Sequence, residues 1–419
     1  MQINDVLKKE IENINPDKEA MDKINKTSRD FCEQLKNKLK QNKIDAQVFV
    51  GGSLAKNTIV KKNKYDIDVF VRFNKKYKNK EISELLGKQI PNAKKVHGSR
   101  DYYQMVVNDI LIEVIPVLEI KNPKQAKNVT DLSFFHVKYV VDKIKKNKKL
   151  ANEIRLAKTF CFAQECYGAE SYIHGFSGYV LELLILHYNS FVKFLKHMSN
   201  LDVTDKFIID SERFYKSKQQ VLIELNEAKL QSPIILIDPT FKERNAAASL
   251  NKQTLSKFQQ SIQEFLKSPN LEFFIKKDIG KGMKKKYGGK LITIFVQTTK
   301  QAGDIAGTKS KKFFDFFIYK LKRDIQIKKS EFDYDEDKNL AYFYFVLDKK
   351  AEEIIKGPPI TSIKNLTNFK KAHPNAFIKK GFAYAKLTHN LSFPEWFRNF
   401  VKKEEKIIKE MGIKKVWKE

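Results

Sequence analysis

The chain has 419 residues, which is long enough for several domains with substantial cores. Hydrophobic residues make up 42% and aromatic residues 12%, a composition that excludes an intrinsically disordered protein. Lys and Arg total 80 against 50 acidic residues, and the net charge of +30 indicates a polyanionic partner, either nucleic acid or an anionic membrane. The most apolar stretch, residues 178–188, is interrupted by Glu182 and His187 and is too short to span a bilayer, so we expect nucleic acid and no membrane.

Cysteine usage and the N-terminus indicate the cellular compartment. The three cysteines are odd in number and lack the spacing of a zinc site, so we expect no disulfides: Cys32, Cys161 and Cys166. Residues 1–16 are charged from the start and lack the apolar segment of a signal peptide. Both features predict a protein of the reducing cytoplasm.

Hydrophobic periodicity in the first third of the chain predicts helices followed by strands. Apolar residues recur every three or four positions up to about residue 44, as in helices. Strand patterns follow at residues 46–52, 66–73, 102–107 and 110–120, with a helix at 80–90. Asn108-Asp109 is a typical hairpin turn between the last two strands. This order predicts a small mixed sheet with helices on one side, ending near Lys145.

The remainder of the chain first becomes helical and then alternates. Helical spacing with few helix breakers is found at residues 151–168, 175–198 and 251–268. Residues 276–290 are basic and contain glycine, which predicts a loop. Strand and helix patterns then alternate over residues 290–297, 311–324, 340–349 and 381–390, and a final helix begins at Pro394.

Three acidic residues in strand-like segments are candidates for a metal site. Asp66 and Asp68 share one face of a strand, and two carboxylates that close repel each other unless a cation lies between them. Glu113 lies in an apolar run where an unpaired charge is costly. Three such acids around two Mg²⁺ ions, roughly 3.5–4 Å apart, could activate a hydroxyl and neutralise a leaving pyrophosphate. The alternatives are exposed aspartates on an edge strand, and a glutamate that lies at a strand edge or is paired with a lysine.

A glycine-rich turn precedes the aspartates. Gly51-Gly52-Ser53 follows a strand and is expected to open a short helix with Ser53 as its N-cap. Free amides at a helix N-terminus attract phosphate, and Lys56 adds positive charge one turn later. A phosphate cradle before a metal-binding carboxylate pair favours nucleotidyl transfer, although a Gly-Ser turn alone is usually only a turn.

These motifs resemble those of the polymerase-beta-like nucleotidyltransferases, and more specifically of archaeal-type (class I) CCA-adding enzymes, which are tRNA nucleotidyltransferases. The pattern G-S-x-A-[RK]-x-T, then D-x-D, then a third carboxylate before V-x-P carries the resemblance. Residues 134–140, 153–185 and 238–250 are similar to family segments in the same order. The resemblance covers most of residues 45–275 and is looser beyond them.

The resemblance implies an α+β fold with three domains. They are a polymerase-beta-like nucleotidyltransferase domain at 1–145, a helical central domain at 146–260 and an α/β, ferredoxin-like body and tail at 261–419. It also implies template-independent addition or repair of the 3'-terminal CCA of tRNA from CTP and ATP, with two Mg²⁺ ions as cofactor. The implied partner is the acceptor stem and T-arm of tRNA, and a homodimer is possible.

The resemblance also implies roles for individual residues. The metal carboxylates are Asp66, Asp68 and Glu113, although the family usually has aspartate at the third position and glutamate is longer by about 1.5 Å. The nucleotide-binding residues are Ser53, Lys56, His136, Lys158, Tyr167 and Arg244.

Each nucleotide-binding residue has a plainer interpretation. Lys56 stands where the family often has arginine, and His136 beside two phenylalanines could be a core histidine. Lys158 could extend to solvent, and Tyr167 before Gly168 could simply end a helix. Arg244 is implied to help choose CTP or ATP by donating to cytosine O2/N3 or adenine N1, but it could instead pair with Glu243 or Asp238.

Two alternatives to CCA addition remain from the sequence. One is a poly(A) polymerase or a relative of oligoadenylate synthetase, and the other is a non-catalytic RNA-binding relative, which only the glutamate at position 113 supports. Candidate RNA contacts in the tail are Lys284, Lys285, Lys286, Phe343 and Tyr344, although aromatic residues in an alternating pattern are more often core.

Overall fold

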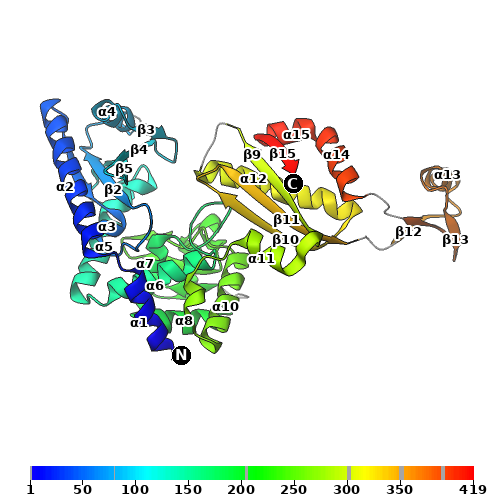
Figure 1. Ribbon diagram of the computed structural model, residues 1–419, viewed down its shortest axis with the longest axis horizontal. Coiled ribbons are helices and arrows are strands. Elements are labelled where there is room, and N and C mark those ends of the chain that lie inside the picture. Colours follow the sequence, from blue (N-terminus) through cyan, green and yellow to red (C-terminus); the bar gives the residue numbers. More distant parts are fainter. Residues whose placement is uncertain (1, 80, 203–205, 300–302, 349–352, 388–391) are drawn as a thin grey trace. The chain divides into compact units, whose positions relative to one another are not determined.

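The computed structural model describes residues 2–79, 81–202, 206–299, 303–348, 353–387 and 392–419. These residues form two compact units, Met1–Lys276 and Lys277–Glu419, each with both helices and sheets (Figure 1). The predicted α+β class is therefore confirmed. All three cysteines are buried and free, as expected. No helix within the described ranges combines the length and apolarity needed to cross a membrane.

A five-stranded mixed sheet forms the first part of the first unit. Its strand order is β1 (Ala46–Val50), β2 (Asp66–Phe73), β5 (Ile110–Leu118), β4 (Tyr102–Val107) and β3 (Lys94–Val96). The central strands β2 and β5 are parallel, and the other pairs are antiparallel. Asn108 and Asp109 both have positive φ, 50° and 62°, as the predicted tight hairpin turn between β4 and β5 requires.

Two helices of the first part cover this sheet. The apolar stripe of α2 (Lys18–Gln41) is buried in the core with the strands, and Figure 1 shows α2 running along the sheet. The shorter α4 (Ile82–Gln89) contacts α2 and β5. Between β1 and β2 lies a single turn, α3 (Gly52–Ala55).

The second part of the first unit is mainly helical. Its helices are α5 (Ser133–Lys146), α6 (Leu150–Ala163), α7 (Gly178–Tyr188), α8 (Phe191–Ser199), α9 (Lys218–Glu224) and α10 (Lys252–Lys267). The stretch predicted as continuous helix at 175–198 is two helices, because Asn189 has a left-handed conformation and Ser190 caps α8. A small sheet of β6 (Phe207–Ile209), β7 (Ile234–Asp238) and β8 (Phe241–Asn245) was not predicted. Short 3-10 helices of the first unit lie at Pro123–Gln125, Val129–Leu132, Glu227–Leu230 and Leu271–Phe274, and another lies in the second unit at Gly288–Lys290.

Core packing in the first unit crosses the expected domain boundaries. Residues of α1 (Ile3–Ile14) pack in the helical core, although they precede the sheet in the chain. The expected boundary at residue 260 falls within α10, and the unit continues to Lys276. The division into three domains with separate roles remains a prediction.

The second unit contains a four-stranded antiparallel sheet. Its order is β10 (Gln326–Asp335), β11 (Leu340–Asp348), β9 (Leu291–Thr298) and β15 (Ile413–Lys418). The chain follows β9, α12 (Gly303–Asp324), β10, β11, α14 (Phe393–Lys403), α15 (Glu405–Glu410) and β15, which is the ferredoxin-like βαββαβ order and confirms that prediction. A second, three-stranded sheet with a helix is inserted after β11: β12 (Glu353–Pro359), α13 (Ile363–Ala372), β13 (Phe377–Lys379) and β14 (Phe382–Leu387).

One prediction for the second unit is wrong, and for two candidate RNA contacts the structure supports the alternative drawn from the sequence. The predicted loop at 276–290 is mostly helix α11 (Ile279–Tyr287), whose first turn is capped by the Asp278 side chain accepting from the Lys281 amide at 2.8 Å. Phe343 and Tyr344 are buried core residues of β11, so neither is available to contact RNA. The three lysines predicted as RNA contacts are exposed on α11: Lys284, Lys285 and Lys286.

Candidate active site

The predicted metal carboxylates lie on the two parallel strands at the centre of the first sheet. Asp66 and Asp68 are two residues apart on β2, and Asp68 lies opposite Glu113 of β5 in the strand register. Gln104 of the adjacent β4 donates from Nε2 to Oε1 of Glu113 at 2.7 Å. Asp66 forms an ion pair with Lys62. The strand pairing therefore brings Asp68 and Glu113 together, while Asp66 and Glu113 each have a protein partner.

The electrostatics of this carboxylate group suit a cation. Burial and the neighbouring charge of Glu113 raise the pKa of Asp68 to about 6, although nearby lysines oppose the shift. Burial lowers the pKa of the Lys62 ammonium, which lies close enough to interact with both Asp68 and Glu113. Carboxylate oxygens are the donors that Mg²⁺ prefers, so the donor set fits such an ion chemically. Among the described residues no three Asp, Glu, His or Cys side chains form a ready metal site, and the three-ligand set remains a prediction.

The glycine turn places α3 directly against the carboxylates. The Gly51 amide donates to the Asp68 carbonyl at 2.8 Å. Gly52 has φ +54°, and a Cβ there would come within 1.7 Å of Asp68 Oδ2, so a side chain at this position is excluded. The prediction that Ser53 is the N-cap is wrong. Ser53 lies inside α3, and the N-cap is Gly51, because the helix begins two residues earlier than expected.

Two lysines predicted to bind phosphate converge on one buried carboxylate. Lys56 Nζ lies 2.7 Å from Oε2 of Glu182, and Lys158 Nζ lies 2.8 Å from Oε1 of the same residue. Glu182, on α7, is only 1% exposed, and both lysines are buried. Lys158 also donates to Thr58 Oγ1 at 3.1 Å. Burial alone would raise the pKa of Glu182, but Lys158 and Lys56 hold it below its ordinary value.

Tyr167 joins the lysines through a close approach to α7. A Cβ on Gly178 would lie 2.9 Å from the Tyr167 hydroxyl oxygen, which is too close, so glycine at this position lets Tyr167 reach the helix beside Lys158. The alternative in which Tyr167 ends a helix before Gly168 is wrong, because α6 already ends at Ala163. Tyr167 instead follows in an extended segment that pairs with Phe176.

His136 and Arg244 come together on a second buried carboxylate, Asp238. Arg244 Nη1 donates to Asp238 Oδ2 at 2.8 Å, and His136 Nε2 lies 2.9 Å from the same oxygen. Because a carboxylate only accepts, the imidazole donates in this hydrogen bond. The Arg244 pairing confirms one of the alternatives drawn from the sequence, whereas Glu243 pairs with Lys124.

Tyr179 of α7 connects the two groups of residues. Its ring stacks on His136 with a centroid distance of 4.1 Å, and its hydroxyl donates to Asp238 Oδ1 at 3.1 Å. Lys56 Nζ and the Arg244 guanidinium lie 5.8 and 5.9 Å from the same ring. The predicted nucleotide-binding residues thus occupy one region of the first unit.

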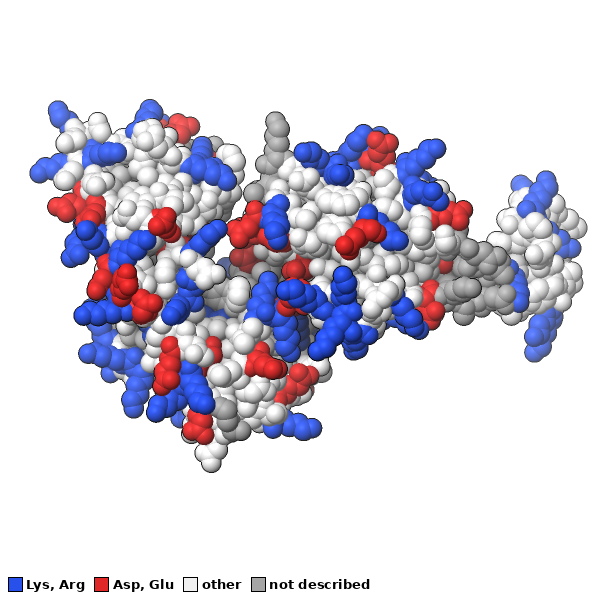
Figure 2. Space-filling model, viewed as in Figure 1, with Lys and Arg blue, Asp and Glu red and all other residues white. Residues whose placement is uncertain are grey.

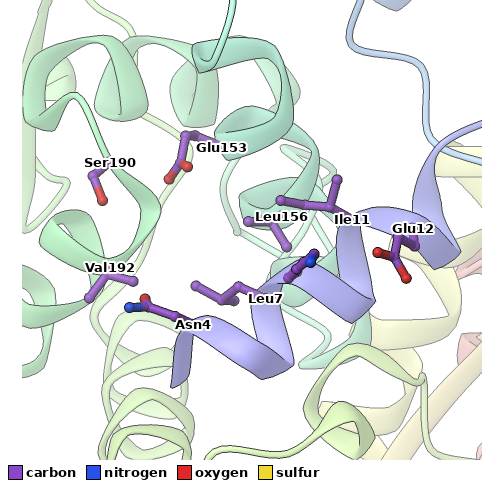
Figure 3. Close-up of a pocket in the computed structure, with 9 residues that line it drawn as sticks. Asn4, Leu7, Ile11, Glu12, Glu153, Leu156, Ser190 and Val192 are labelled. Carbon is purple, nitrogen blue, oxygen red and sulfur yellow. The ribbon is translucent and has the colours of Figure 1, made fainter. Parts of the chain in front are cut away.

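A cavity of about 350 Å³ lies elsewhere in the first unit (Figure 3). Side chains of α1 and α6 face each other across it, including Leu7, Ile11 and Leu156. Glu153 at its wall already accepts from the Phe191 amide at 2.6 Å. No predicted site residue lines this cavity, so it is not part of the candidate site.

The sequence interpretation missed the two residues that organise the site. Glu182 was noted only as an interruption of an apolar stretch, yet a charge inside an otherwise buried helix requires a partner. Asp238, which follows the apolar segment 234–237, was considered only as an alternative partner of Arg244. Tyr179 gave no signal, because an aromatic residue in an apolar helix is usually core.

Comparison with known proteins supports a common origin for this arrangement. Residues 152–275 match the family described as "tRNA nucleotidyltransferase, second domain", and residues 1–133 match "Second Messenger Oligonucleotide or Dinucleotide Synthetase domain". The CCA-adding enzyme of Nanoarchaeum equitans is 36% identical over 342 residues, covering 80% of this chain and 81% of that protein. The CCA-adding enzyme of Methanocaldococcus jannaschii is 29% identical over 411 residues, covering 92% and 88%.

Solved structures share the fold at low sequence identity. A cytoplasmic RNA terminal U-transferase matches with a TM-score of 0.52 and 13% identity, covering 66% of this chain and 99% of that one. The Cid1 poly(U) polymerase matches with a TM-score of 0.51 and 12% identity, covering 65% and 98%. These structural matches establish the nucleotidyltransferase fold. The sequence relatives, which are much more similar to this chain, identify the family within that fold. The chain belongs to the CCA-adding enzyme family of tRNA nucleotidyltransferases.

Proposed function

We propose that this chain adds or repairs the 3'-terminal CCA of tRNA, using CTP and ATP without a template. The observation that carries the proposal is the facing pair Asp68 and Glu113 beside the buried pair Lys56 and Lys158, because nucleotidyl transfer requires acidic ligands next to a triphosphate site. In the reaction the tRNA 3'-oxygen forms a bond to the α-phosphorus of the nucleotide, and the bond to pyrophosphate breaks.

The lysines are suited to hold the triphosphate. Each ammonium has three donors, and Lys56 uses one on Glu182, while Lys158 uses two on Glu182 and Thr58. The remaining donors, with Ser53 and Tyr167, are the groups that we expect to bind phosphate oxygens. Such fixed donors stabilise the charge on the leaving pyrophosphate without reorganising during the reaction.

Membership of a nucleotidyltransferase family implies a divalent metal, and we propose two Mg²⁺ ions held by Asp66, Asp68 and Glu113. When bound, they would activate the 3'-hydroxyl and neutralise the leaving group. Asp66 would have to exchange Lys62 for the metal, since the two side chains are paired. Glu113 would keep its orientation through Gln104.

The partners and location follow from charge and family. Lys and Arg side chains are spread over the visible faces of both units, with acidic residues among them (Figure 2). Such a surface suits the phosphates of the tRNA acceptor stem and T-arm, and the exposed lysines of α11 are candidate contacts. We also propose that the protein acts in the cytoplasm and forms a homodimer.

The test is to incubate the full-length protein with a tRNA transcript lacking CCA, with Mg²⁺, CTP and ATP, and to sequence the 3' ends. We expect addition of C, C and A and no further residues. Asp68→Asn should reduce incorporation by at least about a hundredfold, the scale of losing a key charge-stabilising group. Its matched control is Asp109→Asn in the exposed hairpin turn, which should be fully active.

Other outcomes would identify the alternatives. Long A tails made from ATP alone would indicate a poly(A) polymerase or a relative of oligoadenylate synthetase. Binding of tRNA with no incorporation of either nucleotide would indicate a non-catalytic RNA-binding protein. A fully active Asp68→Asn variant would show that the metal site is misplaced.

A further inference from the structure

The Asp238 carboxylate accepts five hydrogen bonds beside the candidate site. It lies at the end of β7 and is 0% exposed. Oδ2 accepts from Arg244 and His136, as described above. Oδ1 accepts from the Tyr179 hydroxyl at 3.1 Å and from the Thr240 amide and hydroxyl at 2.8 and 2.7 Å. One carboxylate therefore fixes groups from α5, α7 and β8.

This pairing leaves most of the Arg244 guanidinium available. A guanidinium has five N–H donors. Within the described residues Arg244 gives the protein one hydrogen bond, from Nη1 to Asp238. Its side chain remains 26% exposed, whereas that of Asp238 is fully buried. Asp238 thus holds the guanidinium through Nη1 alone, and the other N–H donors of Arg244 can reach a ligand.

The orientation of these donors matters for the choice of base. Cytosine N3 and adenine N1 are hydrogen-bond acceptors, whereas the corresponding positions of uracil and guanine carry N–H donors. A guanidinium offers donors only. Where it is held facing this ring nitrogen, it therefore matches cytosine N3 and adenine N1 and opposes the N–H groups of uracil and guanine. A site that hydrogen-bonds its substrate rejects an analogue lacking the complementary group much more strongly than an apolar pocket does.

We infer that Asp238 is a specificity-determining positioning residue, which holds Arg244 so that the site accepts C and A and rejects U and G. The inference rests on the proposed function and extends it to a residue that touches no substrate. The same carboxylate also holds His136 and Tyr179, and the Arg244 guanidinium lies next to the Tyr179 ring.

The test is a comparison of nucleotide selectivity in Asp238→Asn and wild type. The amide keeps the shape but has one acceptor oxygen, so it cannot serve the donors on both sides of the carboxylate. On transcripts lacking CCA, the ratio of kcat/KM for CTP over UTP should fall by about tenfold or more. On transcripts ending in CC, the ratio for ATP over GTP should fall similarly.

Glu182→Gln is the matched control, since it also neutralises a buried carboxylate of the same region. Glu182 faces the lysines, which we expect to bind phosphates, and all four nucleotides carry the same phosphates. The Glu182→Gln variant should therefore lower every kcat/KM by the same factor and leave the CTP/UTP and ATP/GTP ratios unchanged. If Asp238→Asn lowers all four values equally, or if Glu182→Gln changes the ratios as much, the inference is overturned.

Folding is checked separately, by far-ultraviolet circular dichroism and gel filtration. Should Asp238→Asn not fold, Tyr179→Phe removes one donor to the carboxylate and keeps the ring; we expect a smaller loss of selectivity in the same direction, and unchanged ratios would overturn the inference. A wild-type protein that extends no tRNA would refute the proposed function instead. The two failures are therefore distinguishable.

Discussion

Replacing Glu182 by glutamine should destabilise the first unit by about 3 kcal/mol. The carboxylate is buried and accepts from Lys56 and Lys158 at 2.7 and 2.8 Å. Glutamine can accept from one lysine through its oxygen, but its amide nitrogen then faces the other ammonium. Removing one partner of a buried ion pair costs roughly 3–5 kcal/mol, and we expect the lower end because Thr58 also binds Lys158.

The measurement must report on the first unit alone. Both tryptophans, Trp396 and Trp417, lie in the second unit, so tryptophan fluorescence reports only there. Amide hydrogen exchange of α6 and α7 during urea titration reports the stability around Glu182. The control is Asp142→Asn. It breaks an exposed ion pair with Lys138, whose N–O distance of 2.8 Å is similar to those at Glu182, and it should leave exchange of α6 and α7 unchanged. A loss below about 1 kcal/mol for Glu182→Gln would refute the buried pairing.

The carboxylate site gives two further predictions. The folded pKa of Asp68, about 6, exceeds its unfolded value near 3.8, so this residue costs no stability at low pH and destabilises increasingly as pH rises towards neutrality. Without divalent cations, stability should therefore fall between about pH 4 and pH 7, and Asp68→Asn should abolish that fall as measured by hydrogen exchange. Lys62→Ala removes a cation that competes for Asp66, so Mn²⁺ should bind several-fold more tightly by calorimetry, whereas Lys61→Ala should bind it like wild type. Unchanged Mn²⁺ affinity in Lys62→Ala would show that the ion pair does not compete with metal.

Features that depend on neighbouring residues could be predicted from the sequence. The alternation of Asp66 and Asp68 with apolar residues identified β2, and Asn108-Asp109 identified the hairpin. In both cases the residue types within a few positions determine the backbone conformation. The pairing of Asp68 with Glu113 needed only the further expectation that two apolar strands adjoin.

Helix α11 shows where local reasoning failed. Gly280 and Gly282 lower helix propensity, and the sequence therefore predicted a loop. The helix forms because Asp278 caps it and Met283 is buried against Tyr344 of β11. Tertiary packing, which no single segment reveals, supplies most of the stability of such a short helix.

The organising carboxylates could not be found locally for the same reason. Glu182 is separated from Lys56 by 126 residues, and Asp238 is separated from His136 by 102. A sequence read segment by segment can show that a buried charge needs a partner, but not which distant residue provides it. The partners become evident only when α7 is placed between α6 and the small sheet.

Helix α7 also explains how one site could treat phosphate and base differently. Tyr179 and Glu182 are three residues apart and so lie on the same face, about one helical turn from each other. Glu182 fixes the two lysines, which we propose bind the phosphates that all nucleotides share. Tyr179 reaches Asp238, which fixes the arginine expected to face the base. A rigid helix sets the separation of these two groups. If both bind the nucleotide as we propose, a wrong base could improve its fit at Arg244 only by moving the triphosphate away from the lysines.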